Sequence, residues 1–562
     1  MTIGTILTVI LISVTNLTIT EPVDGETYDG DWLPLRAIVE NENEIPDSVH
    51  YSLNGQTAAL IPRLNTDWYT YMQNDQRNGY SESPAPHDAT ILWTAPVTGM
   101  GHEFVSPVVV NGWVYQASEE QEILFCLDAA TGTEIWRFED IGDDIDDAVH
   151  VEDGRVYLAS DSIWCLDALT GAKIWSFGES EPHFFGGPPV LYSDQIFFCG
   201  LYVYSLDCLS GEEIWRTDTL HTASSLTAWN DMLFVPTTYG KFYALNTETG
   251  ETEWVTDGFG TFWDSSPAIV DGEIYIGSWN GSLYRIDALT GSVINEFTYG
   301  SLRPIESTPA ILDDLVYFGL DYYFYCVDRF SGLLQWELEI GNDFLHASPG
   351  VADGLVFWGD HDGDAPKDSV VHIHAVDIET GTEVWNYEIT NAWKGVLSSP
   401  AITDGVMYIG AGDGNLYAFG TGLKYTYRED YFYAEVGSNE LIVTSFDEGS
   451  AVAADTINFT VTQTGITLEP SSRLALCASP NPFYSEATIS FELSKPGWTL
   501  VTVCDLSGRI VRTLENSELG TGQHSIIWDG RRKNCEPVPV GLYLLRIQSG
   551  GISETIGLCL LR

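Results

Sequence analysis

Basic residues are scarce in this chain of 562 residues. Lys and Arg together number 24, whereas Asp and Glu number 81, so the formal net charge is −57. Such a charge repels phosphate groups, which excludes nucleic acid and anionic lipid surfaces from the expected partners. The acidic residues are scattered along the chain, and they therefore predict a solvated surface and not a disordered acidic tail. A surface of this kind suits divalent cations and cationic partners.

Cysteine pairs of the kinds that bind metals or cross-link small domains are missing. The nine cysteines include no Cys-x-x-Cys and no adjacent pair, and an odd number cannot pair completely within one chain. This excludes a zinc ribbon and a full disulfide framework. Cys126, Cys165 and Cys326 share one position of a repeat described below, and other copies have alanine there. We therefore interpret these cysteines as small buried hydrophobic residues.

Apolar runs long enough to cross a membrane are also missing. Residues 4–14 form an apolar stretch that is too short to span a bilayer as a helix and has the length of a signal-peptide core. No basic residue precedes Arg36, and no A-x-A cleavage site follows. Residues 1–16 are therefore interpreted as a truncated signal segment or as a first β-strand. We expect export by this segment.

Familiar catalytic motifs are absent as well. The chain has no G-x-S-x-G elbow, no H-E-x-x-H and no P-loop. Histidines are few, and carboxylates are too numerous for the sequence alone to indicate a catalytic pair. We predict no catalytic residue from the sequence, which leaves enzyme activity unsupported.

What the chain does contain is a short phrase, typically hydrophobe-Asp-x-x-[Thr/Ser]-Gly, that recurs seven times. Its glycines are spaced by 39, 40, 39, 41, 41 and 49 residues, and they are Gly132, Gly171, Gly211, Gly250, Gly291, Gly332 and Gly381. A tryptophan usually follows four residues later, and the tryptophans of this pattern are Trp93, Trp136, Trp175, Trp215, Trp254, Trp336 and Trp385. A period near 40 built from short strands predicts a propeller or another repeat array.

Each phrase follows two apolar strands joined by a tight turn such as Asn-Gly or Asp-Gly, as in residues 106–115 and 266–275. Eight such strand pairs occur. The eighth phrase, residues 416–420, stops before its tryptophan, whereas Trp93 stands before the first phrase. Joining the two would supply the missing fourth strand and close a ring without free edges. The sequence therefore predicts an all-β fold with an eight-bladed β-propeller over residues 66–421. Asn295 stands where one tryptophan is expected, which predicts a looser interface there.

Strand-rich segments flank the propeller. Residues 17–64 and 425–465 alternate in polarity as half-buried strands do, and we predict that they form one Ig-like sandwich interrupted by the propeller. Two unrelated strand-rich linkers are the alternative. Residues 470–562 are predicted to form a second β-sandwich, with landmarks at residues 479–483, 503–511, 528–530 and 539–543.

The repeated phrase resembles the tryptophan-docking repeat of quinoprotein (PQQ-type) propellers and of the assembly factor BamB, and residues 68–80 resemble the lead-in of secreted members. The resemblance implies the fold. PQQ-dependent members typically carry two adjacent cysteines and a Glu/Asn/Asp set that holds calcium. Here the nearest cysteines, Cys199 and Cys208, lie nine residues apart, and no calcium set can be placed. We therefore expect no PQQ, and Ca²⁺ is the one cofactor that stays possible.

The C-terminal segment resembles the FlgD-like Ig domain of bacterial surface proteins and is similar to type IX secretion sorting domains. That resemblance implies delivery to the cell exterior and a secretion machinery as a partner. A plain accessory Ig domain without a sorting role is the alternative.

Two groups of residues are candidates for binding. The loops that enter the innermost strands should open at one mouth of the propeller, where mixed aromatic and polar groups suit a peptide, glycan or small ligand. These candidates are His102, Glu103, His183, Phe184, Phe185, Trp263, Asp264, Arg303, Glu306, His346 and Lys394. In the insertion 360–368, Asp360, Asp362 and Asp364 alternate as possible Ca²⁺ ligands, with an ordinary acidic turn as the other interpretation.

The leading hypothesis is a secreted or cell-surface, non-catalytic β-propeller that binds or scaffolds a protein, glycan or small ligand. Two alternatives remain open. One is an extracellular enzyme, quinoprotein-like or polysaccharide-active, that uses the propeller mouth. The other is a BamB-like outer-membrane assembly factor. For that function we expect a location in the periplasm instead of at the cell exterior. Fold alone does not decide among them.

Overall fold

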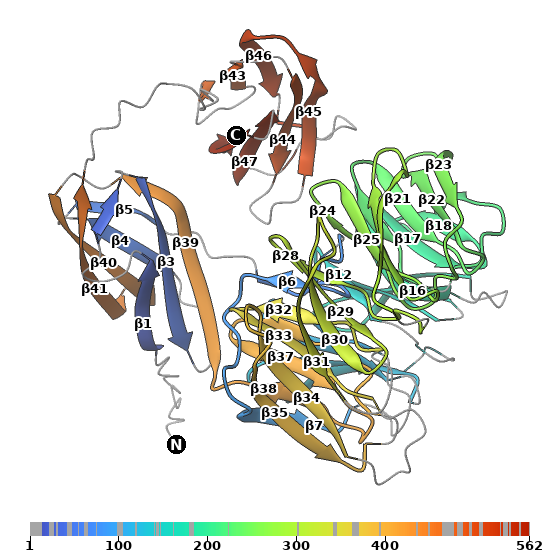
Figure 1. Cartoon of the computed structure of the whole chain (residues 1–562). Coiled ribbons are helices and arrows are strands. Elements are labelled where there is room, and N and C mark those ends of the chain that lie inside the picture. The colour runs from blue at the N-terminus through green and yellow to red at the C-terminus, as the bar shows by residue number, and fades with distance from the viewer. Residues whose placement is uncertain are drawn as a thin grey trace, which may run out of the picture. The chain divides into compact units, whose positions relative to one another are not determined.

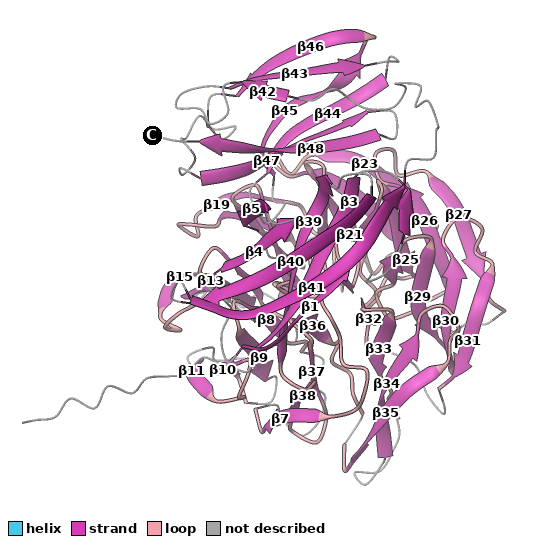
Figure 2. Ribbon diagram, turned by 90° about the vertical axis from the view of Figure 1, so that its left-hand side faces the viewer, coloured by secondary structure: helices cyan, strands magenta, loops and turns pink. Residues whose placement is uncertain are grey.

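Strands are the regular elements of this protein, and the described part of the chain contains no helix (Figure 2). The computed structural model describes residues 14–21, 27–29, 32–41, 48–53, 56–60, 66–74, 76–97, 105–118, 121–139, 141, 145, 148–160, 162–178, 185–222, 224–300, 303–340, 346–361, 370–392, 395–433, 437–447, 450–462, 477–479, 487–493, 497–504, 510–528, 530–531, 538, 541–549 and 552–560. The chain divides into two compact units, Met1–Thr462 and Gln463–Arg562. The predicted all-β fold class is confirmed.

Eight antiparallel sheets, numbered here in chain order, form the larger part of the first unit (Figure 1). Sheet 1 contains β8 (Val108–Val110), β9 (Trp113–Ser118), β10 (Ile123–Asp128) and β11 (Glu134–Phe138). Sheet 2 contains β12 (His150–Glu152), β13 (Arg155–Ala159), β14 (Ile163–Asp167) and β15 (Lys173–Phe177). Sheet 3 contains β16 (Phe185–Tyr192), β17 (Gln195–Gly200), β18 (Val203–Asp207) and β19 (Glu213–Arg216). Sheet 4 contains β20 (Thr227–Trp229), β21 (Met232–Pro236), β22 (Lys241–Asn246) and β23 (Thr252–Asp257).

The second half of the array repeats this plan. Sheet 5 contains β24 (Ala268–Val270), β25 (Glu273–Gly277), β26 (Ser282–Asp287) and β27 (Val293–Thr298). Sheet 6 contains β28 (Ala310–Leu312), β29 (Leu315–Leu320), β30 (Tyr323–Asp328) and β31 (Leu334–Glu339). Sheet 7 contains β32 (Gly350–Ala352), β33 (Leu355–Gly359), β34 (Val370–Asp377) and β35 (Glu383–Thr390), with β6 (Tyr80–Ser81) added in parallel. Sheet 8 contains β36 (Ala401–Thr403), β37 (Val406–Gly410), β38 (Leu416–Phe419) and β7 (Ile91–Ala95).

The turn between the first two strands of each sheet explains the Asn-Gly and Asp-Gly signals. Asn111 and Gly112 have φ of 52° and 76°, and Asp271 and Gly272 have φ of 54° and 75°. Positive φ at both central residues matches the right-handed twist of the strands they join. These two-residue turns set the register that places apolar side chains inside each sheet.

The first strands of the eight sheets contact one another in cyclic order, with β36 returning to β8. A ring of hydroxyl groups, from Ser106, Ser266, Thr308, Ser348 and Ser399, reinforces this arrangement. Each hydroxyl oxygen accepts a hydrogen bond from a backbone N–H of the preceding sheet, and the one from Ser399 to Ser106 joins sheet 8 to sheet 1 at 2.9 Å. The Ser-Pro and Thr-Pro pairs of the sequence therefore link neighbouring sheets.

The outer strand of sheet 8 comes from the N-terminal side of the array. β38 pairs with β7, and Ala418 lies opposite Trp93. This is the closure that the incomplete eighth phrase predicts, and it is confirmed. It covers the edge that β38 would otherwise expose.

The repeated phrase joins neighbouring sheets through a tryptophan contact, here called the tryptophan latch. The indole Nε1 atoms of Trp93, Trp136, Trp175, Trp215, Trp254 and Trp336 donate to a carbonyl in the phrase turn of the following sheet, at 2.9–3.3 Å. Trp385 donates to the Pro86 carbonyl at 3.0 Å. Gly132 has φ of +67°, and a Cβ there would lie 2.6 Å from the Trp93 ring. Glycine is required at this position because the conformation and the close ring both exclude a side chain.

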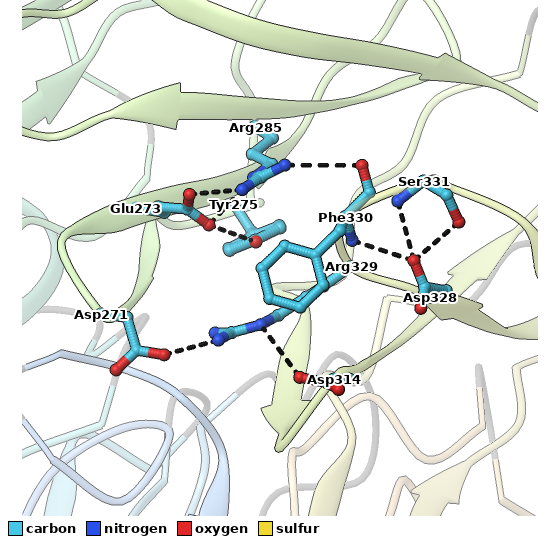
Figure 3. Close-up of polar contacts among 9 residues, drawn as sticks. All are labelled: Asp271, Glu273, Tyr275, Arg285, Asp314, Asp328, Arg329, Phe330 and Ser331. Carbon is cyan, nitrogen blue, oxygen red and sulfur yellow. Dashed lines mark hydrogen bonds and ion pairs between the residues drawn. The ribbon is translucent and has the colours of Figure 1, made fainter. Parts of the chain in front are cut away.

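The junction between sheets 5 and 6 lacks the tryptophan and is built differently (Figure 3). Phe297 packs against Gly332 in its place, and the looser interface expected at Asn295 stays a prediction. Arg285 occupies a repeat position at which the other sheets have a small residue, namely Cys, Ser or Ala. Its guanidinium pairs with Glu273 and donates to the Phe330 carbonyl at 3.4 Å. Arg329 reaches back to Asp271 at 2.5 Å.

Residues 68–74 and 76–81, here called the axial segment, run along the first strands. Backbone hydrogen bonds of 2.8 Å join the axial segment to Val109, Val151, Ile269, Ile311 and Val351, which belong to five different sheets. Arg77 is fully buried and donates to the carbonyls of Leu226, Tyr71 and Pro188 at 2.6, 3.0 and 3.1 Å. The axial segment therefore ties the sheets together along their inner strands.

The flanking strands of the first unit form two further sheets. One contains β1 (Val14–Glu21), β3 (Trp32–Asn41) and β39 (Leu423–Tyr433). The other contains β2 (Thr27–Asp29), β41 (Ser450–Thr462), β40 (Gly437–Asp447), β4 (Ser48–Leu53) and β5 (Gln56–Leu60). Strands from before and after the eight sheets thus pair directly, as β3 does with β39.

The second unit contains two sheets around its own core. One contains β42 (Cys477–Ser479), β43 (Ala487–Leu493) and β46 (Gly522–Trp528). The other contains β45 (Ile510–Leu519), β44 (Gly497–Cys504), β47 (Gly541–Ser549) and β48 (Ile552–Leu560). Trp528 is buried in this core against Tyr543. Among the described residues of the whole chain, no helix has the length and apolarity needed to cross a membrane.

Candidate functional site

Three of the residues predicted at the propeller mouth come together in the structure. Asp264, Glu306 and His346 each stand four residues before the first strand of their sheet, which is β24, β28 and β32 respectively. Their side-chain ligand atoms all lie within 4.8 Å of one another. We call these three residues the mouth cluster. Because they occupy one register position in three consecutive sheets, the ring itself places them side by side.

The mouth cluster lies at a defined level of the ring. Asp264, Glu306 and His346 each precede a member of the hydroxyl ring by two residues, and the residues bonded to the axial segment follow further along the same strands. Strands advance about 3.3 Å per residue, so the cluster, the hydroxyl ring and the axial segment succeed one another along the strands. The axial segment therefore contacts the first strands beyond the hydroxyl ring, on the side away from the mouth cluster.

The electrostatics of the mouth cluster are unusual for carboxylates. His346 Nδ1 lies 3.1 Å from Glu306 Oε2, and Glu306 is buried. Exclusion of water by the surrounding protein, and secondly the charge of Glu306, raise the pKa of Asp264 to about 7. Asp264 nevertheless keeps solvent access and has a positive φ of 67°. The cluster thus holds a carboxyl group that changes protonation near neutral pH.

Two exposed aromatic rings stand beside this cluster. Trp263 precedes Asp264, and its ring centroid lies 5.8 Å from that of Trp279 in the β25–β26 turn. They are 46% and 43% exposed, which is unusual for a residue as large and apolar as tryptophan. Trp279 was not predicted. The sequence could have indicated Trp279, because it lies in the turn between β25 and β26. This turn is at the same end of sheet 5 as the loop that contains Trp263.

Of the other predicted mouth residues, Arg303 is the one whose side chain the structure describes outside this group. Arg303 is exposed, with its Nε atom 3.8 Å from Asp321 Oδ1. The structure does not describe five further residues predicted at the mouth, which are His102, Glu103, His183, Phe184 and Lys394. Phe185 begins β16, and its side chain is not described.

A second group of potential metal ligands appears in sheet 7. Asp360, His372 and His374 have ligand atoms within 4.8 Å of one another. Asp360 belongs to the predicted acidic loop, whereas Asp362 and Asp364 lie outside the described residues. The two histidines were missed, although His-x-His on a strand places both side chains on one face.

Comparisons with known proteins agree with the repeat. Residues 84–200, 200–322 and 304–423 match the family described as outer membrane protein assembly factor BamB. The chain is 24% identical over 365 residues to the BamB of Shewanella oneidensis, covering 58% of this chain and 87% of that protein. It is 25% identical over 233 residues to the BamB of Yersinia pestis, covering 38% of this chain. The chain spans 55% of the length of the Yersinia protein.

A solved quinohemoprotein alcohol dehydrogenase from Pseudomonas putida HK5 shares the fold, with a TM-score of 0.52 and 16% identity over 64% of this chain and 81% of that one. The FlgD resemblance has a short, partial counterpart. The basal-body rod modification protein FlgD of Salmonella typhimurium is 39% identical over 64 residues, which is 11% of this chain and 28% of that protein. The tryptophan latches, the ring of first strands and the family match over residues 84–423 together show that this chain belongs to the BamB-type family of PQQ-like β-propeller repeats.

Proposed function

We propose that this protein is a non-catalytic binding propeller of the cell envelope or cell surface, which holds a protein segment at the mouth cluster. The observation that carries the proposal is the juxtaposition of clustered carboxylates with two exposed tryptophans on sheet 5. The match to an assembly-factor family supports a protein ligand, since the relatives are named for the assembly of outer membrane proteins. A periplasmic location is the alternative to the cell exterior.

The chemistry of the mouth favours a ligand with a basic side chain. Asp264 and Glu306 present carboxylates, and the faces of Trp263 and Trp279 attract ammonium and guanidinium groups. The net charge of −57 raises the local concentration of such a ligand and speeds its association. A peptide that carries Lys or Arg beside an aliphatic residue would use both features.

The finer architecture belongs to the same proposal. We infer that the eight sheets are the blades of one closed propeller over residues 66–421, which the contact between β36 and β8 supports. We infer further that residues 17–64 and 425–465 form one Ig-like sandwich, which the pairing of β3 with β39 supports. Residues 470–562 would be a FlgD-like domain with a type IX sorting role, which the short FlgD match supports.

A peptide and glycan array with the purified chain tests the binding proposal. We expect signal on peptides with Lys or Arg, decreasing with salt because the contacts are ionic. Trp263→Ala should lower binding at least tenfold. Leu169→Ala is the matched control, because Leu169 is 67% exposed in the β14–β15 turn and should leave binding unchanged. Binding that survives Trp263→Ala and Glu306→Gln together would overturn the proposal.

Cell fractionation tests the sorting role of the C-terminal segment. The chain with residues 470–562 should reach the cell exterior, and the chain without them should stop in an earlier compartment. If both reach the same compartment, the sorting role is wrong while the binding proposal stands.

A second candidate function, a polysaccharide-active enzyme, is favoured by the pair of carboxyl groups in the mouth cluster. Carboxylate oxygens of Asp264 and Glu306 lie within 4.8 Å of each other, and burial with the Glu306 charge raises the pKa of Asp264 to about 7, as a general acid in glycoside hydrolysis requires. Release of reducing ends from a polysaccharide panel would support it, with activity falling above pH 7 as Asp264 loses its proton. Asp264→Asn should then abolish release, and a panel without any released ends would exclude this function.

A further inference from the structure

The ends of β33 and β34 bring together a carboxylate and two imidazoles. Asp360 Oδ2 lies 3.0 Å from His372 Nδ1 and 3.6 Å from His374 Nε2. The backbone holds this arrangement, because the Asp360 N–H donates to the His372 carbonyl at 2.9 Å and Asp360 Oδ1 accepts from the His372 N–H. The three side chains therefore converge from two paired strands, which position a site more firmly than a loop does.

Sheet register explains the convergence. His372 and His374 are two residues apart on β34 and project from one face. Asp360 directly follows β33, whose Gly359 pairs with Ile373, so its carboxylate meets the same face.

His374 is held in the orientation of a metal ligand. Its ring is buried, with 9% exposed, and stacks on Trp358 at 5.2 Å. Its Nδ1 lies 2.7 Å from Glu383 Oε1, whereas its Nε2 is buried and makes no hydrogen bond. A carboxylate that accepts the Nδ1 proton leaves the Nε2 lone pair free for a cation, which is the arrangement found around many metal-bound histidines.

We propose that Asp360, His372 and His374 bind one Zn²⁺ or a similar transition-metal cation, oriented by Glu383. Two imidazole nitrogens and one carboxylate oxygen are a zinc ligand set, whereas Ca²⁺ takes oxygen ligands. Asp360 is thus a metal ligand, as the sequence predicted, but the metal that it binds is Zn²⁺ and not Ca²⁺. Asp360 and His372 are 14% and 34% exposed as side chains, which leaves a path for the cation to enter. Three protein ligands leave a fourth position for water or for a donor atom of a bound molecule.

Calorimetry with ZnCl₂ and CaCl₂ on the full chain, stripped with EDTA, tests the proposal. We expect one equivalent of Zn²⁺ and no calcium at this site. His372→Gln, which alters the more exposed ligand and so disturbs the core least, should lower zinc affinity at least a hundredfold. Glu383→Gln should lower it about 10- to 100-fold, as loss of an orienting partner does. His524→Gln in the second unit is the matched control and should bind as the unaltered chain does.

The mouth cluster is the competing zinc site, and Glu306→Gln separates the two. Zinc binding that is lost in Glu306→Gln and retained in His372→Gln would overturn the proposal, as would no zinc binding at all. Cobalt substitution gives a readout that does not depend on the variants. The visible spectrum should be that of four-coordinate cobalt with nitrogen and oxygen ligands, and absence of cobalt bands would mean that the cluster is a plain His–Asp ion pair.

Discussion

At the residue scale, most of the acidic phrase residues are committed to turns. Asp377 Oδ1 accepts from the backbone and the hydroxyl of Thr380 at 2.8 and 2.7 Å, and these hydrogen bonds hold the pKa of Asp377 below its usual range. Ser331 lowers the pKa of Asp328 in the same way. Asp264 is the opposite case, because its environment raises its pKa. The contrast separates turn carboxylates from a carboxylate with another role.

Asp264→Asn should change the pH dependence of stability. The pKa of Asp264 rises from an ordinary value of 3.8 to about 7 on folding, so the folded chain binds the extra proton between these values. Stability therefore falls as the pH rises from about 4 to about 7, and the loss is complete above that. Thermal unfolding at pH 8 should show the Asn variant as more stable, and at pH 4 the two should agree. An equal difference at both pH values would contradict the assignment.

Trp136→Ala should cost more than loss of an exposed tryptophan. Trp136 packs against Gly171 and donates to the Ala168 carbonyl at 2.9 Å, and removal of a buried tryptophan typically costs about 3–5 kcal/mol. Urea unfolding of Trp136→Ala and of the exposed Trp279→Ala measures the difference. Equal losses in the two variants would show that the latch contributes little to stability.

At the element scale, the junction of sheets 5 and 6 shows how one departure from the repeat is compensated. Asn295 replaces the tryptophan, and Arg285 replaces the small residue that lies opposite it in the sheet. The Arg285 side chain fills the space and pairs with Glu273, which also accepts from Tyr275 at 2.8 Å. The two changes depend on each other, because an arginine beside a tryptophan would crowd the site and an asparagine beside alanine would leave it empty.

Arg285→Ala should therefore destabilise the chain by about 1–3 kcal/mol, the range for breaking a hydrogen bond to a charged group. A double-mutant cycle with Glu273→Ala, read by urea unfolding, should give a coupling energy above about 0.5 kcal/mol because the partners are in contact. Additive losses would mean that Arg285 acts through packing alone.

At the scale of the whole molecule, the chain consists of two units with separate cores. The core of the second unit contains residues from 487 to 558, all of them after the division at residue 462. Domains with their own cores fold independently as a rule. A chain that ends at Thr462 should keep the unfolding midpoint of its first unit in calorimetry and lose one transition. A lowered midpoint would show that the second unit stabilises the first.

Several features could be predicted because they depend on neighbours in sequence. Residues 416–420 and Trp93 indicated the closure of the array, since a repeat with a missing fourth strand requires one from elsewhere. The buried state of Cys126 and Cys165 followed from their repeat position. The axial segment could not be predicted, because the five first strands whose backbones bond to it come from positions far apart in the chain.

The all-β class, the repeat, the turns and the tryptophan contacts can be read from the amino-acid sequence, because each rests on local propensity or on a period near 40 residues. Which side chains meet depends on the folded chain. The ring brings Asp264, Glu306 and His346 together across 82 residues of chain, and the register of β33 with β34 places Asp360 beside two histidines that no motif connects to it. The physical reason is that contact between distant residues depends on closure and register, which arise only when all sheets pack at once.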